Sequence, residues 1–506
     1  MDIIKAVISK VNKKYALLFL TGLWCAYLQS SAELALFAFV SYAPLVYCLC
    51  RFDCKRGFAK CFVSFFAPYY FYQLAFLMTV YSQLDLDRPL AVMLLLLAVV
   101  ALTAWECLLM FLPVYLFTYL RRDRIYDAAV LAVLAAGGEW LEEKIPFLSF
   151  PWSSVWLSVT AKPLLLQPAN LLGCRAVTVL VLTVNGLAAF AVMDKKRVLP
   201  LASLAAVLCA WLGYGYYSVN RIESISSKSP VITAVVAQDE IEGSKKSDCT
   251  AWDCARSYRK IITASQIEKA DLVVFPETAV PMGYKAEAQE FSVVSGLAKS
   301  YDTTVVNGCF FRFDGDEYNA LYAVDSKGKV SEPYFKQVLV PFGEKIPLAF
   351  LFGASSLCEC SDEQHTKPLD TALGRIGCAI CIESIYPETV RSQAANGAQI
   401  LCVCTNDSWF GKSFARQMHF RHSIMRAAEN GRYLLRSGNC GISAIIKPTG
   451  EVQSIRSNTS KGVVTGQVRL IGERTLYSRF KDLFTVLPAL LVVIAVIKMY
   501  GSRKQD

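Results

Sequence analysis

Three polar residues stand at the ends of short apolar runs, and their types suit covalent catalysis. Cys381 ends the run Gly-Cys-Ala-Ile-Cys, Glu277 follows Leu-Val-Val-Phe-Pro, and Lys336 follows Tyr-Phe. A cysteine attacks as its thiolate, so it needs a base or a positive charge close by. Because the ends of neighbouring strands gather side chains at one edge of a sheet, we predict that Cys381 is a nucleophile and that Glu277 and Lys336 activate it.

Each of these residues also has an ordinary structural explanation when it is taken alone. A cysteine after an apolar strand is usually a small buried core residue, Glu277 suits a turn, and Lys336 suits a solvated sheet edge. Cys378 competes as the nucleophile, but in a strand a residue three positions away points to the opposite face. Of these two cysteines, Cys381 is the one followed two residues later by a carboxylate, Glu383. The combination therefore favours the catalytic interpretation.

The segments around these residues resemble the nitrilase, or carbon–nitrogen hydrolase, superfamily, whose catalytic triad is glutamate, lysine and cysteine in that order. The resemblance is carried by residues 275–279, 336–344, 377–388, 405–413 and 436–443. It implies a four-layer αββα sandwich and assigns the triad to Glu277, Lys336 and Cys381. It also implies that Glu344 orients the lysine and that Glu383 supports the turn carrying the cysteine. Taken alone, Glu344 reads as a surface carboxylate and Glu383 as a charge at a helix start.

The composition is too apolar for an ordinary soluble protein. The chain has 506 residues, of which 54% are hydrophobic, and its mean hydropathy is +0.37. The apolar runs lie mostly before residue 220, and one more closes the chain. We predict a membrane domain of about seven transmembrane helices at 1–221, a globular α/β catalytic domain at 222–481, and a last transmembrane helix with a tail at 482–506.

Eight segments are predicted to cross a membrane, and the charges flanking them indicate an orientation. A span needs ~20 apolar residues, which makes the first and fifth segments, the two shortest, the weakest candidates. The net charge of +10 comes from basic clusters that all fall on one side if every segment crosses. By the positive-inside rule this side is the cytoplasm, which places the catalytic domain in the periplasm of a bacterium. The segments are 14–29, 33–50, 58–81, 90–120, 126–140, 168–193, 199–217 and 483–500.

Two apolar stretches have two interpretations each. The run 346–353 either belongs to the buried core or forms a lid that dips into lipid. Phe-Pro-Trp at 150–152 forms either an aromatic belt at the membrane interface or, as the resemblance implies, part of a lipid entrance. Ile382 stands where the superfamily often has tyrosine, directly after the nucleophile.

Cysteine and histidine spacing predicts no metal site. The chain has three histidines, and no metal-ligand spacing joins them. We therefore expect neither a metal nor another cofactor. In an oxidising compartment, disulfide candidates would be Cys249, Cys254, Cys358 and Cys360.

With its membrane segments, the chain resembles the branch of the superfamily that acylates lipoproteins. The resemblance implies that Cys381 takes an acyl group from a phospholipid as a thioester. The α-amino group of a diacylglyceryl-modified cysteine at the N-terminus of an apolipoprotein would then accept it. We expect a monomer in the bacterial inner membrane and no nucleic-acid partner. A membrane-anchored nitrilase-type amidohydrolase would need only one or two spans, and a catalytically inactive scaffold would not need the triad.

Overall fold

The structure is a computed structural model in which the chain divides into two compact units. A helical unit comprises residues 1–168, 172–215 and 482–506, and an α/β unit comprises 169–171 and 216–481. The predicted apolar stretch 346–353 lies outside the described residues, as do Cys249, Cys358 and Cys360. The structure describes residues 12–31, 33–52, 54–83, 87–145, 149–194, 197–240, 250–264, 269–280, 289–313, 316–340, 344, 363–480 and 483–503.

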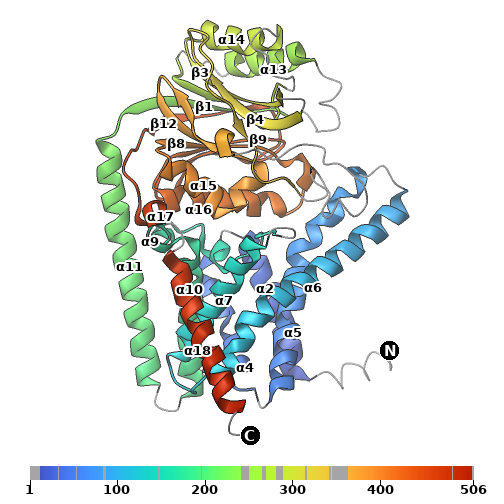
Figure 1. Cartoon of the computed structure of the whole chain (residues 1–506), viewed down its shortest axis with the longest axis vertical. Coiled ribbons are helices and arrows are strands. Elements are labelled where there is room, and N and C mark those ends of the chain that lie inside the picture. Colours follow the sequence, from blue (N-terminus) through green and yellow to red (C-terminus); the bar gives the residue numbers. More distant parts are fainter. Residues whose placement is uncertain are drawn as a thin grey trace. The chain divides into compact units, whose positions relative to one another are not determined.

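All eight segments predicted to cross a membrane are largely helical (Figure 1). Among the described residues, four helices are long and apolar enough to span a membrane: Lys55–Tyr81, Arg88–Leu120, Cys174–Met193 and Val198–Ser227. These helices identify a membrane protein, while eight crossings remain a prediction. The helices are α2 (Lys13–Ser30), η1 (Ala35–Phe37), α3 (Ala38–Ser41), α4 (Ala43–Cys50), α5 (Lys55–Leu74), η2 (Ala75–Gln83), α6 (Arg88–Leu120), α7 (Asp127–Lys144), η3 (Val155–Val159), α8 (Pro163–Leu166), α9 (Ala169–Leu172), α10 (Cys174–Met193), α11 (Val198–Ser227), η8 (Leu483–Thr485) and α18 (Val486–Arg503).

Two predicted spans are interrupted for identifiable reasons. The sixth was expected to begin at 168, but the long helix α10 begins only at Cys174, because Gly173 before it has φ +82°, a conformation that glycine adopts readily. The second is divided between η1, α3 and α4. At this break the side chain of Asn185, on α10, accepts a hydrogen bond from Tyr42 N at 2.8 Å and donates one to Ala38 O at 2.7 Å. Asn185 thus adds hydrogen bonds to backbone groups at the break, where apolar surroundings offer few other partners.

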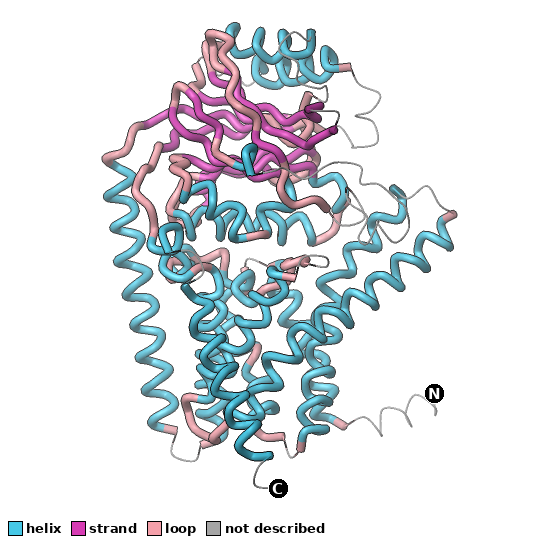
Figure 2. Tube along the Cα trace, in the orientation of Figure 1, coloured by secondary structure: helices cyan, strands magenta, loops and turns pink. Residues whose placement is uncertain are grey.

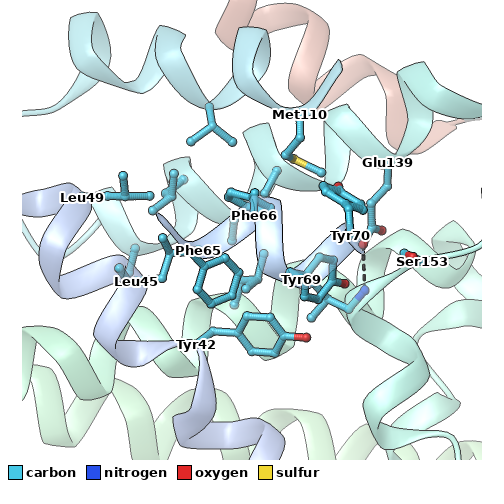
Figure 3. A pocket seen from close by; sticks show the side chains of 18 residues that line it. Tyr42, Leu45, Leu49, Phe65, Phe66, Tyr69, Tyr70, Met110, Glu139 and Ser153 are labelled. Carbon is cyan, nitrogen blue, oxygen red and sulfur yellow. Dashed lines mark hydrogen bonds between the residues drawn. The ribbon is translucent and has the colours of Figure 1, made fainter. Parts of the chain in front are cut away.

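A cavity of about 40 Å³ lies in the helical unit, and Tyr42, Phe65, Tyr69, Tyr70 and Glu139 are among the residues that line it (Figure 3). Glu139 accepts hydrogen bonds from Val155 N at 2.8 Å and from Thr178 Oγ1 at 2.9 Å. The carboxylate therefore ties η3 to both α7 and α10. Its buried oxygens have donors, as polar groups in apolar surroundings require.

The α/β unit contains two six-stranded sheets, which Figure 2 shows in magenta. Their strand orders are β12-β1-β2-β3-β4-β5 and β11-β10-β9-β8-β7-β6. The central pairs β1/β2, β2/β3, β7/β8 and β8/β9 are parallel, and the outer pairs are antiparallel. The strands are β1 (Val231–Gln238), β2 (Leu272–Val274), β3 (Thr304–Phe313), β4 (Asp316–Val324), β5 (Tyr334–Phe335), β6 (Leu369–Thr371), β7 (Gly374–Ile380), β8 (Ile400–Asn406), β9 (Leu434–Asn439), β10 (Ser443–Ile446), β11 (Val452–Arg456) and β12 (Gly462–Arg469).

The two sheets pack face to face through one apolar core. Ile232, Ala234 and Val236 on β1 belong to the same buried cluster as Ile376 and Ile380 on β7. Helices α13 (Ala251–Ala264) and α14 (Gln289–Ser300) cover the outer face of the first sheet, and α15 (Pro387–Ala395) and α16 (Ala415–Asn430) cover that of the second (Figure 1). The predicted αββα order is therefore confirmed.

We expect Asn185→Leu to lower the thermal unfolding midpoint of the protein purified in detergent. Tyr42 N–H and Ala38 C=O would each lose the hydrogen bond to Asn185, and a buried hydrogen bond contributes about 0.5–1.5 kcal/mol. Asn220→Leu is the control, because the Asn220 side chain is exposed and donates to Tyr216 O within its own helix. Equal midpoints for Asn185→Leu and the wild type would show that the break does not depend on Asn185.

Candidate active site

Cys381 lies at a sharp turn between β7 and the short helix η6 (Cys381–Ile385). Its φ of +52° is left-handed, which costs a residue other than glycine about 1–3 kcal/mol and is common at functional sites. The Cys381 carbonyl accepts hydrogen bonds from Ser384 Oγ and His419 Nε2, both at 3.0 Å. These two bonds hold the turn that presents the thiol.

Side-chain alternation along a strand was used to choose Cys381 over Cys378, and this argument is wrong because the two residues do not lie in one strand. Strand β7 ends at Ile380, so strand alternation does not apply to Cys381. Cys378 stays inside the strand, fully buried, with its Sγ 3.9 Å from Ile376 O. Only Cys381 occupies the strained turn, and the case for it as the nucleophile rests on that position.

Glu277 lies just beyond the end of β2 and accepts three described hydrogen bonds. Its Oε1 accepts from Lys336 Nζ at 3.1 Å and from Asn319 Nδ2 at 2.8 Å, and its Oε2 accepts from Asn406 N at 2.8 Å. A Cβ on the neighbouring Gly308 would lie 2.6 Å from Pro276 O. The turn carrying Glu277 therefore fits only against a glycine.

Lys336 follows β5 and is buried between two carboxylates. Its Nζ lies 2.8 Å from Glu344 Oε1 and 3.1 Å from Glu277 Oε1. Burial lowers the pKa of the ammonium, but the charges of Glu277 and Glu344 outweigh burial and raise that pKa well above its ordinary value. Burial likewise raises the pKa of Glu344, and Lys336 outweighs it, so that pKa is lowered. Both groups are ionised near neutral pH.

The charges of Glu277 and Lys336 both act on the thiol of Cys381. Burial and the negative charge of Glu277 raise its pKa, while the charge of Lys336 and a hydrogen bond with Thr405 oppose the rise only in part. The resting group is therefore the thiol, and a base must remove its proton before attack. The structure brings Glu277, Lys336 and Cys381 together at the strand ends, as predicted for a nucleophile, a base and a cation.

Glu383 joins the turn of Cys381 to the segment that carries Lys336. Its carboxylate accepts hydrogen bonds from Ile380 N at 2.6 Å, Val338 N at 3.2 Å and Tyr334 Oη at 2.9 Å. Burial raises the pKa of Glu383 to about 7, against these hydrogen bonds. Its position fits the supporting role that the resemblance implies.

Several buried polar groups at this site were missed from the sequence. Asn319 donates to both Glu277 Oε1 and Glu344 Oε1, the latter at 3.2 Å. Asp407 and His419 lie behind the turn of Cys381, 2.9 Å apart between Oδ1 and Nδ1. The available signals were an asparagine inside an apolar strand and an aspartate directly after one, since polar groups are buried only with partners.

Two family models match separate parts of the chain. Residues 233–475 match the model described as carbon-nitrogen hydrolase. Residues 21–187 match the model described as apolipoprotein N-acyltransferase N-terminal domain. The first region lies in the α/β unit and the second in the helical unit, so both units have relatives. The predicted resemblance to the carbon–nitrogen hydrolases is confirmed.

Relatives extend along nearly the whole chain. An apolipoprotein N-acyltransferase of Geobacter metallireducens is 27% identical over 520 residues, which cover 98% of this chain and 96% of that protein. Another from Gloeobacter violaceus is 29% identical and covers 69% of this chain and 68% of its own. A crystal structure of a carbon-nitrogen hydrolase from Helicobacter pylori is 19% identical, covers 47% of this chain and 89% of that one, and has a TM-score of 0.36.

Glu383 should give the fold a characteristic dependence on pH. A carboxyl group whose pKa is raised stabilises the fold below the ordinary value of 4.5, and this contribution is lost as pH rises through about 7. The lowered pKa values of Asp407 and Glu344 place their titration below about pH 5. We therefore expect the wild-type unfolding midpoint to fall more than that of Glu383→Gln between about pH 5 and about pH 8.

The matched control is Glu388→Gln, which removes a carboxylate paired with Arg391 on the neighbouring helix α15. It should keep the wild-type slope of midpoint against pH. If Glu383→Gln also keeps that slope, the carboxyl group of Glu383 does not titrate in this range.

Proposed function

The chain belongs to the apolipoprotein N-acyltransferase family, and we propose that it transfers an acyl chain from a phospholipid to the α-amino group of an apolipoprotein. The acceptor is the diacylglyceryl-modified cysteine at the N-terminus of the lipoprotein. The observation that carries the proposal is the Lys336–Glu277 ion pair, 3.1 Å between Nζ and Oε1, next to the strained Cys381 turn. A membrane-embedded chain with a buried nucleophile suits a reaction between two lipids.

In the first half of the reaction, Cys381 becomes acylated. Glu277 takes the thiol proton, and the sulfur attacks the ester carbonyl carbon of the phospholipid. The tetrahedral oxyanion forms beside the Lys336 ammonium, where one donor typically contributes ~3 kcal/mol. The intermediate collapses with cleavage of the ester C–O bond, and the leaving oxygen takes the proton from Glu277. The products are a thioester on Cys381 and a lysophospholipid.

In the second half, the lipoprotein amine replaces the sulfur. The amine nitrogen attacks the thioester carbonyl carbon and gives a proton to Glu277. The C–S bond then breaks, and the Cys381 sulfur recovers a proton from Glu277. Glu344 keeps Lys336 in place during both steps through the 2.8 Å contact between its Oε1 and Nζ. Glu383 holds the segments of Cys381 and Lys336 together.

The basic clusters at the ends of the apolar helices support a bacterial inner-membrane location with the α/β unit in the periplasm. Diacylglyceryl lipoproteins and phospholipid would both reach a site on that side. The same helices argue against a membrane-anchored amidohydrolase, which needs only one or two spans. A monomer supplies every group that this mechanism uses.

We expect Cys381→Ala to abolish both lysophospholipid release and transfer, because the attacking sulfur is lost. Cys378→Ala is the matched control, since it alters a buried cysteine of the preceding strand, and it should retain activity. After incubation with phospholipid, tandem mass spectrometry should find an acyl group on Cys381 of the wild type. Loss of activity in both variants would mean that Cys381 has no special role.

Topology gives a separate test of location. Reporter fusions after Arg122 and after position 196 should report the cytoplasm, because both follow basic clusters. A fusion at Asn458, which lies between β11 and β12, should report the periplasm. A cytoplasmic signal at Asn458 would contradict the periplasmic assignment and with it the proposed acceptor.

A further inference from the structure

His419 lies behind the nucleophile, on α16, in a fully buried position. Its Nε2 lies 3.0 Å from both Cys381 O and Ser384 Oγ, and its Nδ1 lies 2.9 Å from Asp407 Oδ1. The imidazole therefore connects the backbone of the nucleophile to a buried carboxylate. The mechanism proposed above assigns it no part.

The hydrogen-bond partners determine where the hydrogens of this ring lie. A carbonyl oxygen only accepts, so the contact with Cys381 O requires a hydrogen on Nε2. Nδ1 has two neighbours, Asp407 Oδ1 at 2.9 Å, which only accepts, and Arg436 Nη2 at 3.1 Å, which only donates. Because Arg436 Nη2 already donates to Asp407 Oδ2 at 2.8 Å, we assign the shorter contact to Nδ1, which therefore also carries a hydrogen. We assign both hydrogens from the hydrogen-bond network. With both in place, His419 is an imidazolium cation.

A second cation shares the same carboxylate. Arg436, on β9, places Nη2 at 2.8 Å from Asp407 Oδ2 and 3.1 Å from Oδ1, and its Nη1 donates to Ser423 Oγ at 3.0 Å. Burial raises the pKa of Asp407, but the charges of Arg436 and His419 outweigh burial and lower that pKa. Two cations and one anion give this cluster a net positive charge.

The cluster also reaches the thiol through a hydroxyl group. Thr405 Oγ1 donates to Asp407 Oδ1 at 2.9 Å, and the same side chain is hydrogen-bonded to the Cys381 thiol. A hydroxyl has one hydrogen to donate. When the sulfur becomes a thiolate, the Thr405 hydroxyl can rotate and donate its hydrogen to the sulfur instead of to Asp407. Asp407 then still accepts hydrogen bonds from His419 and Arg436.

We propose that His419, as an imidazolium paired with Asp407, is a positioning residue for Cys381. It holds the Cys381 carbonyl so that the left-handed turn persists, and it places positive charge behind the sulfur so that the thiolate forms more readily. The described charged or titratable groups that contact it come from η6, η7 (Asp407–Phe410) and β9, and they are Cys381, Asp407 and Arg436. The inference rests on the proposed function only for the identity of the acyl donor.

The test measures the thiol without any lipid substrate. Full-length protein in detergent reacts with iodoacetamide across a pH series, and mass spectrometry follows the alkylation of Cys381, with the exposed Cys54 as internal reference. For His419→Gln we expect alkylation of Cys381 near neutral pH to fall about tenfold, with the rate–pH curve moved about one unit upward. Glutamine keeps a donor for the carbonyl but removes the charge.

His422→Gln is the matched control. It removes an equally buried imidazole three residues further along α16 and leaves the His419 contacts to Cys381 and Asp407 in place. We expect it to follow the wild-type curve. A His419→Gln curve that coincides with the wild-type curve would overturn the proposal.

If His419→Gln opens the core, the buried Cys378 will be alkylated as well, and the alkylation rate of Cys381 will no longer report on His419 alone. The protonation state of His419 is then measured directly in the wild type. The chain has three histidines, so nitrogen-15 labelling of histidine gives three ring systems, which His422→Gln and His365→Gln assign. We expect two protonated ring nitrogens for His419 near neutral pH. One bare ring nitrogen would overturn the proposal. A positive result in a protein that transfers no acyl group would leave this inference standing and remove the proposed function instead.

Discussion

The ammonium group of Lys336 lies between the carboxylates of Glu277 and Glu344 where water does not reach it, and the rest of the site depends on this arrangement. Burying an ion costs several kcal/mol unless charges and hydrogen bonds replace its water. The two carboxylates replace water around Lys336, and their own hydrogen bonds come from both sheets. Asn319, on β4 of the first sheet, donates to both carboxylates. Asn406 ends β8 of the second sheet, and its N–H donates to Glu277 Oε2 at 2.8 Å. The hydrogen bonding of the ion pair is therefore complete only when the two sheets pack face to face.

Strained backbone conformations occur next to both of the sheets that pack face to face. Cys381, which follows β7 of the second sheet, and Thr278, which follows β2 of the first, have φ values of +52° and +46°. Residues other than glycine hold such values only where their surroundings fix them. Glu383 supplies part of that constraint, because it bonds both Ile380 N and the segment after Tyr334. The strained conformation of Cys381 is thus stabilised in part through Glu383, which bonds a segment of the first sheet.

The residues at the ends of strands could be predicted from local patterns, whereas the αββα order was implied by the resemblance to the carbon–nitrogen hydrolases. Strand ends after apolar runs identified Glu277, Lys336 and Cys381. Asn319 and His419 do not stand at the ends of strands, and their partners depend on the packing of the sheets and of α16. An asparagine inside an apolar strand indicates that it is buried with a partner, but it does not identify that partner. The left-handed turn at Cys381 was not predicted for a related reason. No glycine marks it in the sequence, because tertiary hydrogen bonds hold it in place.

Charge balance across the nucleophile connects these features. On one side, Lys336 with Glu277 and Glu344 carries a net negative charge; on the other, His419 and Arg436 with Asp407 carry a net positive charge in our assignment. Moving the thiol proton to Glu277 creates no new charge in the buried site, because it transfers the negative charge from the carboxylate to the sulfur, toward the positive cluster. A thiolate that burial alone would disfavour thus forms at reduced cost, and only while Glu277 holds the proton.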